Sequence, residues 1–293
     1  MGMVINELYR IQVADIVISV SCNRPQQDIL FPDSSKSFTS DLPPQLTIHT
    51  SFNDLPDLDL SIVDRIFDSA TVWSLFQFGR KKVLLLGASS FDAHPDGFAI
   101  FDSDFKDVQL FKKGERLTNG LLPDPLQYPL GEVLMICMLA KNRGLMVHAC
   151  GIDDDGRGYL FAGNSTHGKS TLARLWKDRA TILNDDRIIL RKRDGRFWMY
   201  GTPWHGDFNG VSPNGVPLEK IFFLRHAPGN AAHQTNGASG ASMLLSRSFP
   251  PLWDKPGMRF TLDFSDQLIE SIPFYVLDFV PDQSIIDYIR CVN

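Results

Sequence analysis

The stretch GNSTHGKS occupies residues 163–170 and has the spacing G-x-x-x-x-G-K-S. The apolar run Tyr159-Leu160-Phe161-Ala162 precedes it, and a helical pattern from Thr171 to Trp176 follows it. The stretch therefore lies where a strand gives way to a helix. This context predicts a phosphate-binding loop (P-loop) of the Walker A type, whose successive backbone N–H groups point at phosphate oxygens.

The residue types in this loop suit a nucleoside triphosphate. Glycines at both ends permit backbone turns that a Cβ atom would obstruct, and the helix that starts near Lys169 directs the positive end of its dipole at the same place. Lys169 is expected to contact the β- and γ-phosphates of ATP, and the Ser170 hydroxyl to bind Mg²⁺. The predicted nucleotide-binding residues are Gly163, Asn164, Ser165, Thr166, His167, Gly168, Lys169, Ser170 and Thr171.

The composition indicates an ordinary soluble protein. The chain has 293 residues, a net charge of −5 and a pI near 5.8, so it lacks the global basic field of a non-specific nucleic-acid binder. Its four cysteines lack C-x-x-C spacing, which predicts neither a zinc site nor a disulfide framework. No signal peptide and no membrane-spanning apolar stretch is recognisable. We expect a cytoplasmic protein without nucleic-acid or membrane partners.

The pattern of strands and turns predicts two domains. Residues 1–125 are expected to form a β-rich domain, and residues 126–293 a P-loop domain with mixed helices and strands. A segment with several prolines, 114–129, is interpreted as the linker. The strands expected in the first domain are 9–20 (one strand or a pair), 45–49, 71–78, 83–86, 98–101 and 108–111.

The second domain is expected to begin with a strongly apolar helix over 130–143. A hairpin of strands 145–152 and 158–162 then delivers the P-loop, and Asp194-Gly195 joins a second hairpin, 187–192 with 196–200. A polar loop is predicted over 227–239. The remaining expectations are strands 180–183, 218–224 and 274–279 and helices 170–177, 242–246, 264–271 and 283–291.

Two acidic residues follow a short strand about fifteen residues after the P-loop lysine. Asp185 and Asp186 are expected near the phosphates, one carboxylate holding magnesium and the other accepting a proton from an attacking hydroxyl. The two assignments cannot be separated from the sequence, and a simple acidic β-turn is the alternative. His148 lies on an apolar strand, where a histidine is more often a core residue than a catalyst.

These residues together resemble a known family. His148-Ala149, the loop with its flanks, and Leu183-Asn184-Asp185-Asp186-Arg187 are similar in order and spacing to the C-terminal kinase domain of HPr kinase/phosphorylase. The resemblance implies a mixed α/β (α+β) fold like that of PEP carboxykinase, with the P-loop set in a β-rich core. It further implies that His148 lies near the transferred phosphoryl group, that Lys169 and Ser170 serve phosphates and magnesium, and that the two aspartates supply base and metal functions. Assembly into homo-oligomers is implied as well.

The resemblance is specific from 147 to 190 and schematic after that. After Tyr200 the sequence has no Glu followed by an Arg-Gly-Leu-Gly-like run, and Gly201-Thr202-Pro203-Trp204-His205-Gly206-Asp207 stands there instead. We therefore expect a relative of HPr kinase rather than an HPr kinase. Its acceptor is an unidentified protein, peptide or small molecule. His205 and Asp207 are candidates for the acceptor or metal side, with a plain turn as the alternative.

From the residues and the resemblance we expect an ATP- and Mg²⁺-dependent kinase that phosphorylates a hydroxyl group. The predicted catalytic residues are His148, Lys169, Asp185 and Asp186, and the predicted metal ligands are Ser170 and Asp186. The alternative is a module that binds ATP for regulation or as a scaffold without transferring phosphate.

Overall fold

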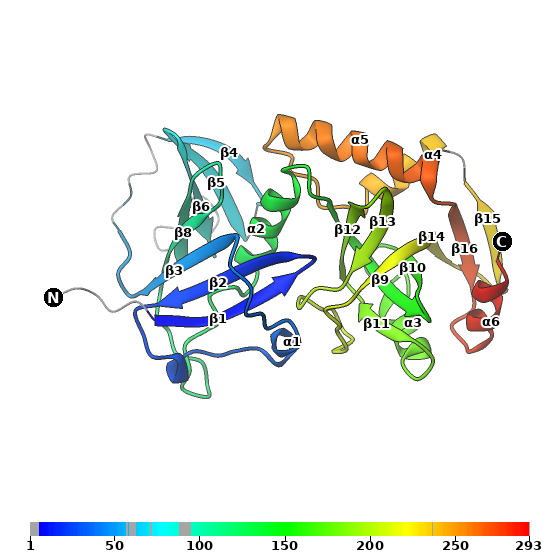
Figure 1. Ribbon diagram of the computed structural model, residues 1–293, viewed down its shortest axis with the longest axis horizontal. Helices are drawn as coiled ribbons and strands as arrows, with labels where there is room; N and C mark the ends of the chain where they lie inside the picture. The colour runs from blue at the N-terminus through cyan, green and yellow to red at the C-terminus, as the bar shows by residue number, and fades with distance from the viewer. Residues whose placement is uncertain are drawn as a thin grey trace. The chain divides into compact units, whose positions relative to one another are not determined.

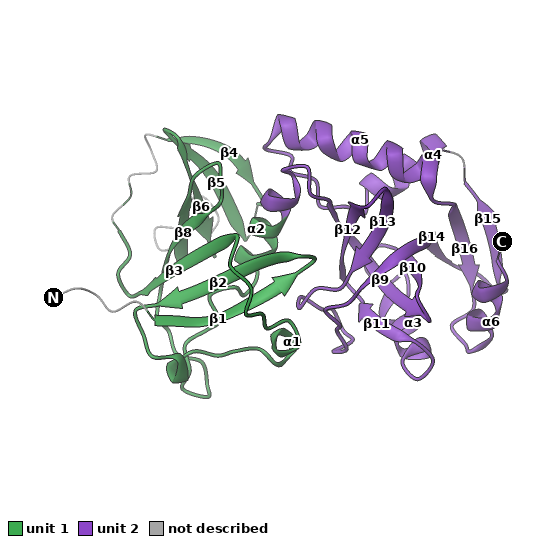
Figure 2. Cartoon of the chain, in the orientation of Figure 1, with its two compact units in different colours: residues 1–135 green, residues 136–293 purple. Residues whose placement is uncertain are grey.

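The computed structural model describes residues 6–56, 58, 63–70, 72–87, 95–235 and 237–292. The chain divides into two compact units, Met1–Met135 and Ile136–Asn293 (Figure 2). Helix α2 (Leu130–Leu139) carries the chain from the first unit into the second. Each unit contains one large mixed sheet, so the fold is mixed α/β with few helices (Figure 1).

Unit 1 is built on an eight-stranded sheet with the order β1-β2-β3-β8-β7-β6-β5-β4. The pairs β2–β3 and β3–β8 are parallel, and the other pairs are antiparallel. Its elements are β1 (Asn6–Val13), β2 (Ile16–Cys22), η1 (Gln26–Asp28), α1 (Asp33–Lys36), β3 (Leu46–Phe52), β4 (Asp64–Asp68), β5 (Trp73–Phe78), β6 (Lys81–Leu86), β7 (Gly97–Phe101) and β8 (Asp107–Lys112).

The alternating sequence patterns explain most of these strands. The segment 9–20, expected as one strand or a pair, lies in the β1–β2 hairpin, and the strands expected at 71–78 and 83–86 pair as β5 and β6. Thr71, the first residue of the strand expected at 71–78, lies outside the described residues. Strand β4 was not expected, because its sequence DRIFD is mostly polar and lies at the sheet edge.

The proline-containing segment interpreted as a linker is packed within unit 1. Leu122 and Leu126 are buried, and Leu122 forms a parallel bridge with Ile29, because the Leu30 N–H donates to the Leu122 carbonyl oxygen and the Leu122 N–H donates to that of Asp28. The Tyr9 hydroxyl donates a hydrogen bond to the buried carboxylate of Asp124. Prolines here interrupt regular structure without freeing the chain from the core.

In unit 2, five strands form a closed circuit of pairings, β10-β9-β12-β13-β14 and back to β10. Strand β16 pairs with β14, β15 with β16, and β11 with β9. The strands are β9 (Leu145–Asp154), β10 (Arg157–Ala162), β11 (Thr181–Asn184), β12 (Arg187–Arg193), β13 (Arg196–Tyr200), β14 (Gly215–His226), β15 (Ala231–Gln234) and β16 (Phe274–Phe279).

Helices cover both faces of the unit 2 sheet (Figure 1). Alternate residues of β9 and β10 face opposite sides, so that Val147 and Leu160 join one apolar core and Ile152 and Phe161 the other. The first core receives α4 (Gly237–Leu245) and α5 (Lys255–Ser271). The second receives α3 (Lys169–Trp176) and α6 (Ser284–Cys291).

Most elements expected after residue 126 are present, with three differences. Strand β15 lies inside the segment expected to be a polar loop. Helix α2 ends at Leu139, and turns follow it to Arg143. Helix α5 starts at Lys255, nine residues before the apolar stretch that suggested it. In α5, the sequence pattern located the second half of the helix and missed its first turns.

The order of strands brings three separate sequence segments together. Strands β11 and β12 follow one another along the same edge of β9, while β10 pairs with the opposite edge. At the same level, Ala149 of β9 pairs with Ala162 at the end of β10, and the Ala149 N–H donates to the Asp186 carbonyl. The P-loop, β9 and the break between β11 and β12 thus meet at one place.

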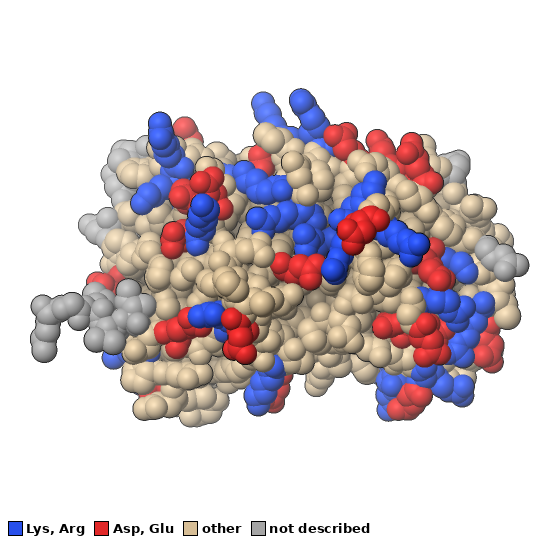
Figure 3. Space-filling view, viewed as in Figure 1, with Lys and Arg blue, Asp and Glu red and all other residues tan. Residues whose placement is uncertain are grey.

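Within the described residues, no helix combines the length and the apolarity needed to cross a membrane. On the face drawn in Figure 3, basic and acidic side chains are interspersed. This agrees with the small net charge of −5.

Candidate active site

The P-loop joins the end of β10 to the start of α3. Thr166 and Gly168 have φ values of 71° and 95°, in the left-handed region. Gly168 is required here, because a Cβ on it would lie 2.6 Å from the Phe279 ring. Helix α3 starts directly after it, at Lys169, as the sequence predicts.

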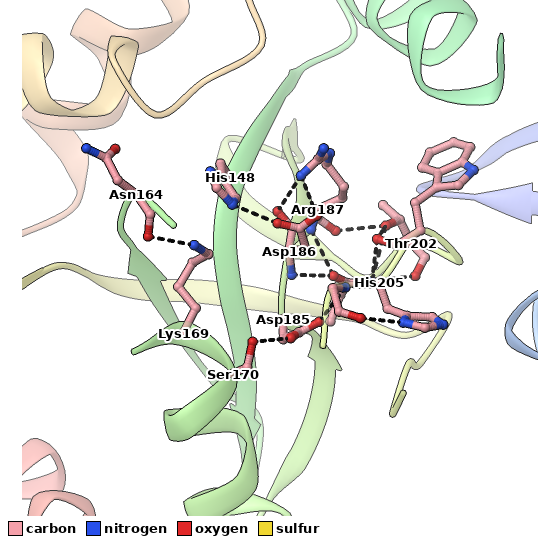
Figure 4. A network of polar contacts seen from close by, with 12 residues as sticks. His148, Asn164, Lys169, Ser170, Asp185, Asp186, Arg187, Thr202 and His205 are labelled. Carbon is pink, nitrogen blue, oxygen red and sulfur yellow. Dashed lines mark hydrogen bonds and ion pairs between the residues drawn. The ribbon is translucent and has the colours of Figure 1, made fainter. Parts of the chain in front are cut away.

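Lys169 closes the loop on itself. Its Nζ donates to the carbonyl oxygens of Gly163 and Asn164, at 2.9 and 3.0 Å (Figure 4). The side chain is buried, and this burial lowers the pKa of Lys169 although the nearby carboxylates of Asp186 and Asp185 raise it. A bound phosphate would offer the ammonium group a stronger acceptor than two carbonyl groups.

Asp185 is the more buried of the two aspartates, at 1% exposure, and its carboxylate accepts three hydrogen bonds. The Ser170 hydroxyl donates to Oδ2 at 2.6 Å, and the Phe208 N–H donates to the same oxygen at 3.0 Å. The Gly206 N–H donates to Oδ1 at 2.8 Å. The carboxylate is therefore fixed beside the hydroxyl group of the P-loop.

Asp186 has different partners. His148 Nε2 lies 2.7 Å from Oδ1, and an Arg187 guanidinium nitrogen lies 2.5 Å from Oδ2 (Figure 4). Burial raises the pKa of Asp186, but the hydrogen bond from His148 and the charges of Arg187, His148 and Lys169 outweigh burial and lower the pKa overall. Arg187 in turn stacks on Phe249, with 4.4 Å from its guanidinium carbon to the ring centre. These contacts thus favour the ionised form of Asp186.

One cavity of about 390 Å³ adjoins both aspartates and the P-loop. Its walls come from all three segments that the sheet brings together and from the chain after β13. The lining residues are His148, Ser165, Thr166, Gly168, Lys169, Ser170, Thr171, Arg174, Asp185, Asp186, Gly206, Asp207 and His226.

The four predicted catalytic residues all line this cavity, as do six of the nine predicted nucleotide-binding residues. Gly163, Asn164 and His167 do not line it. The first two direct their carbonyl oxygens at Lys169. Among the described residues, His167 Nδ1 is buried without a hydrogen-bond partner, and burial lowers the pKa of His167. The binding roles assigned to these three residues stay predictions.

Of the two further candidates, Asp207 lines the cavity and His205 does not. His205 Nδ1 contacts the Gly206 carbonyl oxygen at 2.9 Å. Arg174 of α3 donates to the Asp207 carbonyl oxygen at 3.2 Å, which links the segment after β13 to the helix after the P-loop.

Sequence reasoning missed several residues of the site. His226, at the end of β14, contacts the Thr166 carbonyl oxygen through Nε2 at 3.0 Å. The backbone N–H groups of Gly206 and Phe208 carry no sequence signal at all. Asn184 did carry one, because an Asn at the start of a turn often accepts hydrogen bonds from the next backbone N–H groups.

The site offers oxygen ligands of the kind that magnesium prefers. Among the described residues, no group of three or more His, Cys, Asp or Glu side chains is arranged to hold a metal ion. Magnesium, however, commonly takes one or two protein ligands and completes its shell with phosphate oxygens and water. Ser170 Oγ and Asp185 Oδ2, 2.6 Å apart beside the P-loop, fit that requirement.

No protein-family model and no curated protein matches this chain. Among solved structures, it is similar to the Hpr(Ser) kinase/phosphatase from Coxiella burnetii, with 12% sequence identity and a TM-score of 0.30. The alignment covers 49% of this chain and 85% of that chain. A likeness of this degree does not establish a shared fold.

Proposed function

We propose that this protein is an ATP-dependent, magnesium-dependent kinase that transfers the γ-phosphoryl group to a hydroxyl group. The observation that supports this most is the arrangement of a P-loop and two differently partnered aspartates around one cavity. A protein that only binds a nucleotide needs the P-loop and not the two aspartates. A second carboxylate beside the same cavity supplies a group that can accept the proton of an acceptor hydroxyl.

The proposed roles follow the contacts of each side chain. Lys169 binds the β- and γ-phosphates once these replace the carbonyl groups that it now contacts. Ser170 and Asp185 serve the magnesium side, an assignment supported by their direct hydrogen bond. The sequence prediction, with Asp186 as the metal ligand beside Ser170, finds less support because Asp186 Oδ1 contacts His148 and Oδ2 contacts Arg187. Magnesium, when bound, neutralises charge on the phosphates.

In the proposed reaction, the acceptor hydroxyl oxygen forms a bond to the γ-phosphorus while the bond to the leaving ADP oxygen breaks. The hydroxyl proton passes to Asp186, which its cationic partners keep ionised. His148 orients that carboxylate from 2.7 Å. Positioning and charge neutralisation carry most of the rate in such transfers, so a weakly basic carboxylate is sufficient.

We further propose that unit 2 has a PEP carboxykinase-like topology. The support is that the P-loop follows an antiparallel hairpin, β9–β10, within a mixed sheet, and not a strand of a wholly parallel one. The proposed acceptor is a protein, peptide or small molecule with an accessible hydroxyl group. Homo-oligomers and a cytoplasmic location remain part of the proposal.

The second candidate function is ATP binding without transfer, in a regulatory or scaffold module. It is favoured by one observation: Arg187 and His148 contact the two oxygens of Asp186 and lower its pKa, which weakens the carboxylate as a proton acceptor.

Labelled ATP distinguishes the two. The protein is incubated with γ-labelled ATP, magnesium and fractionated cell extract, and label on acceptors is measured. Asp186→Asn is expected to lower the transfer rate about 100-fold, within the range of general-base effects. Asp178→Asn, an exposed aspartate after α3, is the matched control and is expected to transfer at the wild-type rate. Label that stays on ATP in every fraction contradicts the kinase and favours the binding module.

A further inference from the structure

Asn184 is the last residue of β11 and is fully buried, at 0% exposure. Both the oxygen and the nitrogen of its side-chain amide make hydrogen bonds. The side-chain oxygen Oδ1 accepts hydrogen bonds from the backbone N–H groups of Asp186 and Arg187, at 2.6 and 2.8 Å. The side-chain nitrogen Nδ2 donates to the carbonyl oxygens of Thr202 and Trp204, at 2.8 and 3.1 Å.

These four bonds join two segments that are distant in sequence. The first is the turn that carries the two aspartates. The second is residues 201–208, which donate the N–H groups of Gly206 and Phe208 to Asp185. The Thr202 hydroxyl adds a bond to the Arg187 carbonyl oxygen at 2.8 Å, so the connection is doubled (Figure 4).

The two segments are also close-packed. A Cβ on Gly206 would lie 3.1 Å from Asp185 Oδ2 and 3.2 Å from Asp186 Cβ. The segment therefore has little room to shift without moving both carboxylates. Because Asn184 touches neither the cavity nor a carboxylate directly, it can act on the site only through the backbone that it holds.

We propose that Asn184 is a positioning residue of the phosphoryl-transfer site, whose side-chain amide fixes the Asp185–Asp186 turn against the 201–208 segment. Asp185 thereby meets Ser170 in the geometry that magnesium needs. The effect on magnesium binding rests on the proposed function. The connection that Asn184 makes between the Asp185–Asp186 turn and residues 201–208, called the clamp below, can be measured without nucleotide.

Two substitutions separate the two halves of the clamp. Asn184→Asp keeps the acceptor oxygen for Asp186 and Arg187 but loses the donor to Thr202 and Trp204. Asn184→Ala loses both. Hydrogen exchange in the protein without ligand is expected to rise about tenfold at residues 204–208 in both variants, and at 186–187 in Asn184→Ala alone, since the loss of about 1.4 kcal/mol corresponds to tenfold.

Calorimetry gives the functional readout. The ratio of the ATP dissociation constants without and with magnesium is expected to fall about tenfold in both variants, while the magnesium-free constant stays within about twofold of wild type. Asn209→Asp, on an exposed residue just beyond the same segment, is the matched control and is expected to match wild type in both measurements.

The outcomes distinguish the two proposals. Exchange at 204–208 and a magnesium ratio that both match wild type in Asn184→Ala would overturn the positioning role. If hydrogen exchange rises at 204–208 in the Asn184 variants but the wild-type protein does not bind ATP, the structural role of Asn184 is confirmed and the proposed function is wrong. Exchange that rises throughout unit 2 in both variants shows a general loss of stability and likewise overturns a specific positioning role.

Discussion

Asp124 of unit 1 and Asp186 of unit 2 are both shielded carboxylates with a basic side chain nearby, yet their pKa values move in opposite directions. Burial raises the pKa of Asp124, despite hydrogen bonds from Tyr9 and Leu126 and the charge of Lys112. The same penalty acts on Asp186, but His148 and Arg187 lie within 2.7 and 2.5 Å and lower its pKa.

The difference lies in how each carboxylate is partnered. Lys112 is itself buried, and burial lowers its pKa to about 8. Burial thus favours the neutral form of both groups in unit 1. At Asp186, direct contact with Arg187 and the hydrogen bond from His148 favour the charged form beside a cavity. Burial of a carboxylate alone therefore does not mark a candidate site, whereas a directly paired carboxylate beside a cavity does.

The comparison is tested most strongly by making the same substitution in both units. Asp185→Asn is expected to slow γ-phosphoryl loss from ATP on the order of 1,000-fold, about 4 kcal/mol, because an amide cannot balance magnesium charge. Asp124→Asn is expected to leave the rate within about twofold of wild type. A comparable loss in both variants, measured with γ-labelled ATP, would show that the two clusters are not functionally distinct.

The second prediction concerns Lys112, whose folded-state pKa is lowered from 10.5 to about 8. Between these values the unfolded chain binds more protons than the folded one, so the wild type gains stability as the pH rises. Relative to Lys112→Met, the gain is expected to total about 3 kcal/mol between about pH 8 and pH 10.5.

Urea denaturation at several pH values, followed by circular dichroism, measures this difference. Lys113→Met, at the neighbouring residue outside β8, is the control and is expected to follow the wild-type pH dependence. If the difference in unfolding free energy between wild type and Lys112→Met stays constant over this pH range, the pKa of Lys112 is not lowered in the folded protein.

The sequence allowed prediction of side chains that gather around one cavity, because the P-loop and aspartate patterns depend on side-chain type at fixed spacing. Lys169, Ser170 and the Asp185–Asp186 pair line one cavity as the pattern predicts. The contacts of Gly206 and Phe208 could not be predicted, because a backbone N–H is present at almost every residue. Which aspartate faces Ser170 also depends on the bulge in β11 near Leu183, and not on residue type.

The same limit applies to the fold. Alternation predicted the hairpins β9–β10 and β12–β13, since their turn residues and apolar faces are local. The closure of five strands into a circuit depends on β14 pairing with β10 and β13 across long stretches of sequence. In unit 1, Asp124 looked like part of a linker because its buried partners, Tyr9 and Lys112, are distant in sequence.

The third prediction sharpens the contrast at Asp186. His148→Gln replaces an imidazole that can carry a positive charge with a neutral amide, so the charge of His148 no longer lowers the pKa of Asp186 and that pKa is expected to rise. A carboxylate whose pKa is lower in the folded state stabilises the protein above the pKa of the unfolded state, about 3.9. The protein loses that stability as the pH falls through the folded-state pKa. His148→Gln is therefore expected to lose about 2 kcal/mol at pH 5.5 and progressively less towards pH 2.

Urea denaturation at both ends of this range measures the loss. His233→Gln is the matched control, because His233 is exposed and lies 3.7 Å from Asp278, an ion pair that solvent screens. A His148→Gln deficit that is equal at pH 5.5 and pH 2 would show that His148 contributes packing and not charge.

The smallest expected effect is that of Tyr9→Phe, which removes only the hydroxyl group that donates to Asp124. Below pH 9 the loss is expected to be about 1 kcal/mol, the usual net value of one hydrogen bond. Burial, and then the charge and hydrogen bond of Asp124, raise the pKa of Tyr9 well above 10, so its stabilisation is complete below that pH and lost as the pH rises through the folded value. The deficit of Tyr9→Phe should accordingly shrink in alkali, where the wild type must keep a proton that the unfolded chain releases. Its growth with pH in urea denaturation would mean that Tyr9 is ionised in the folded protein, and the neutral character assigned to the unit 1 cluster would be wrong.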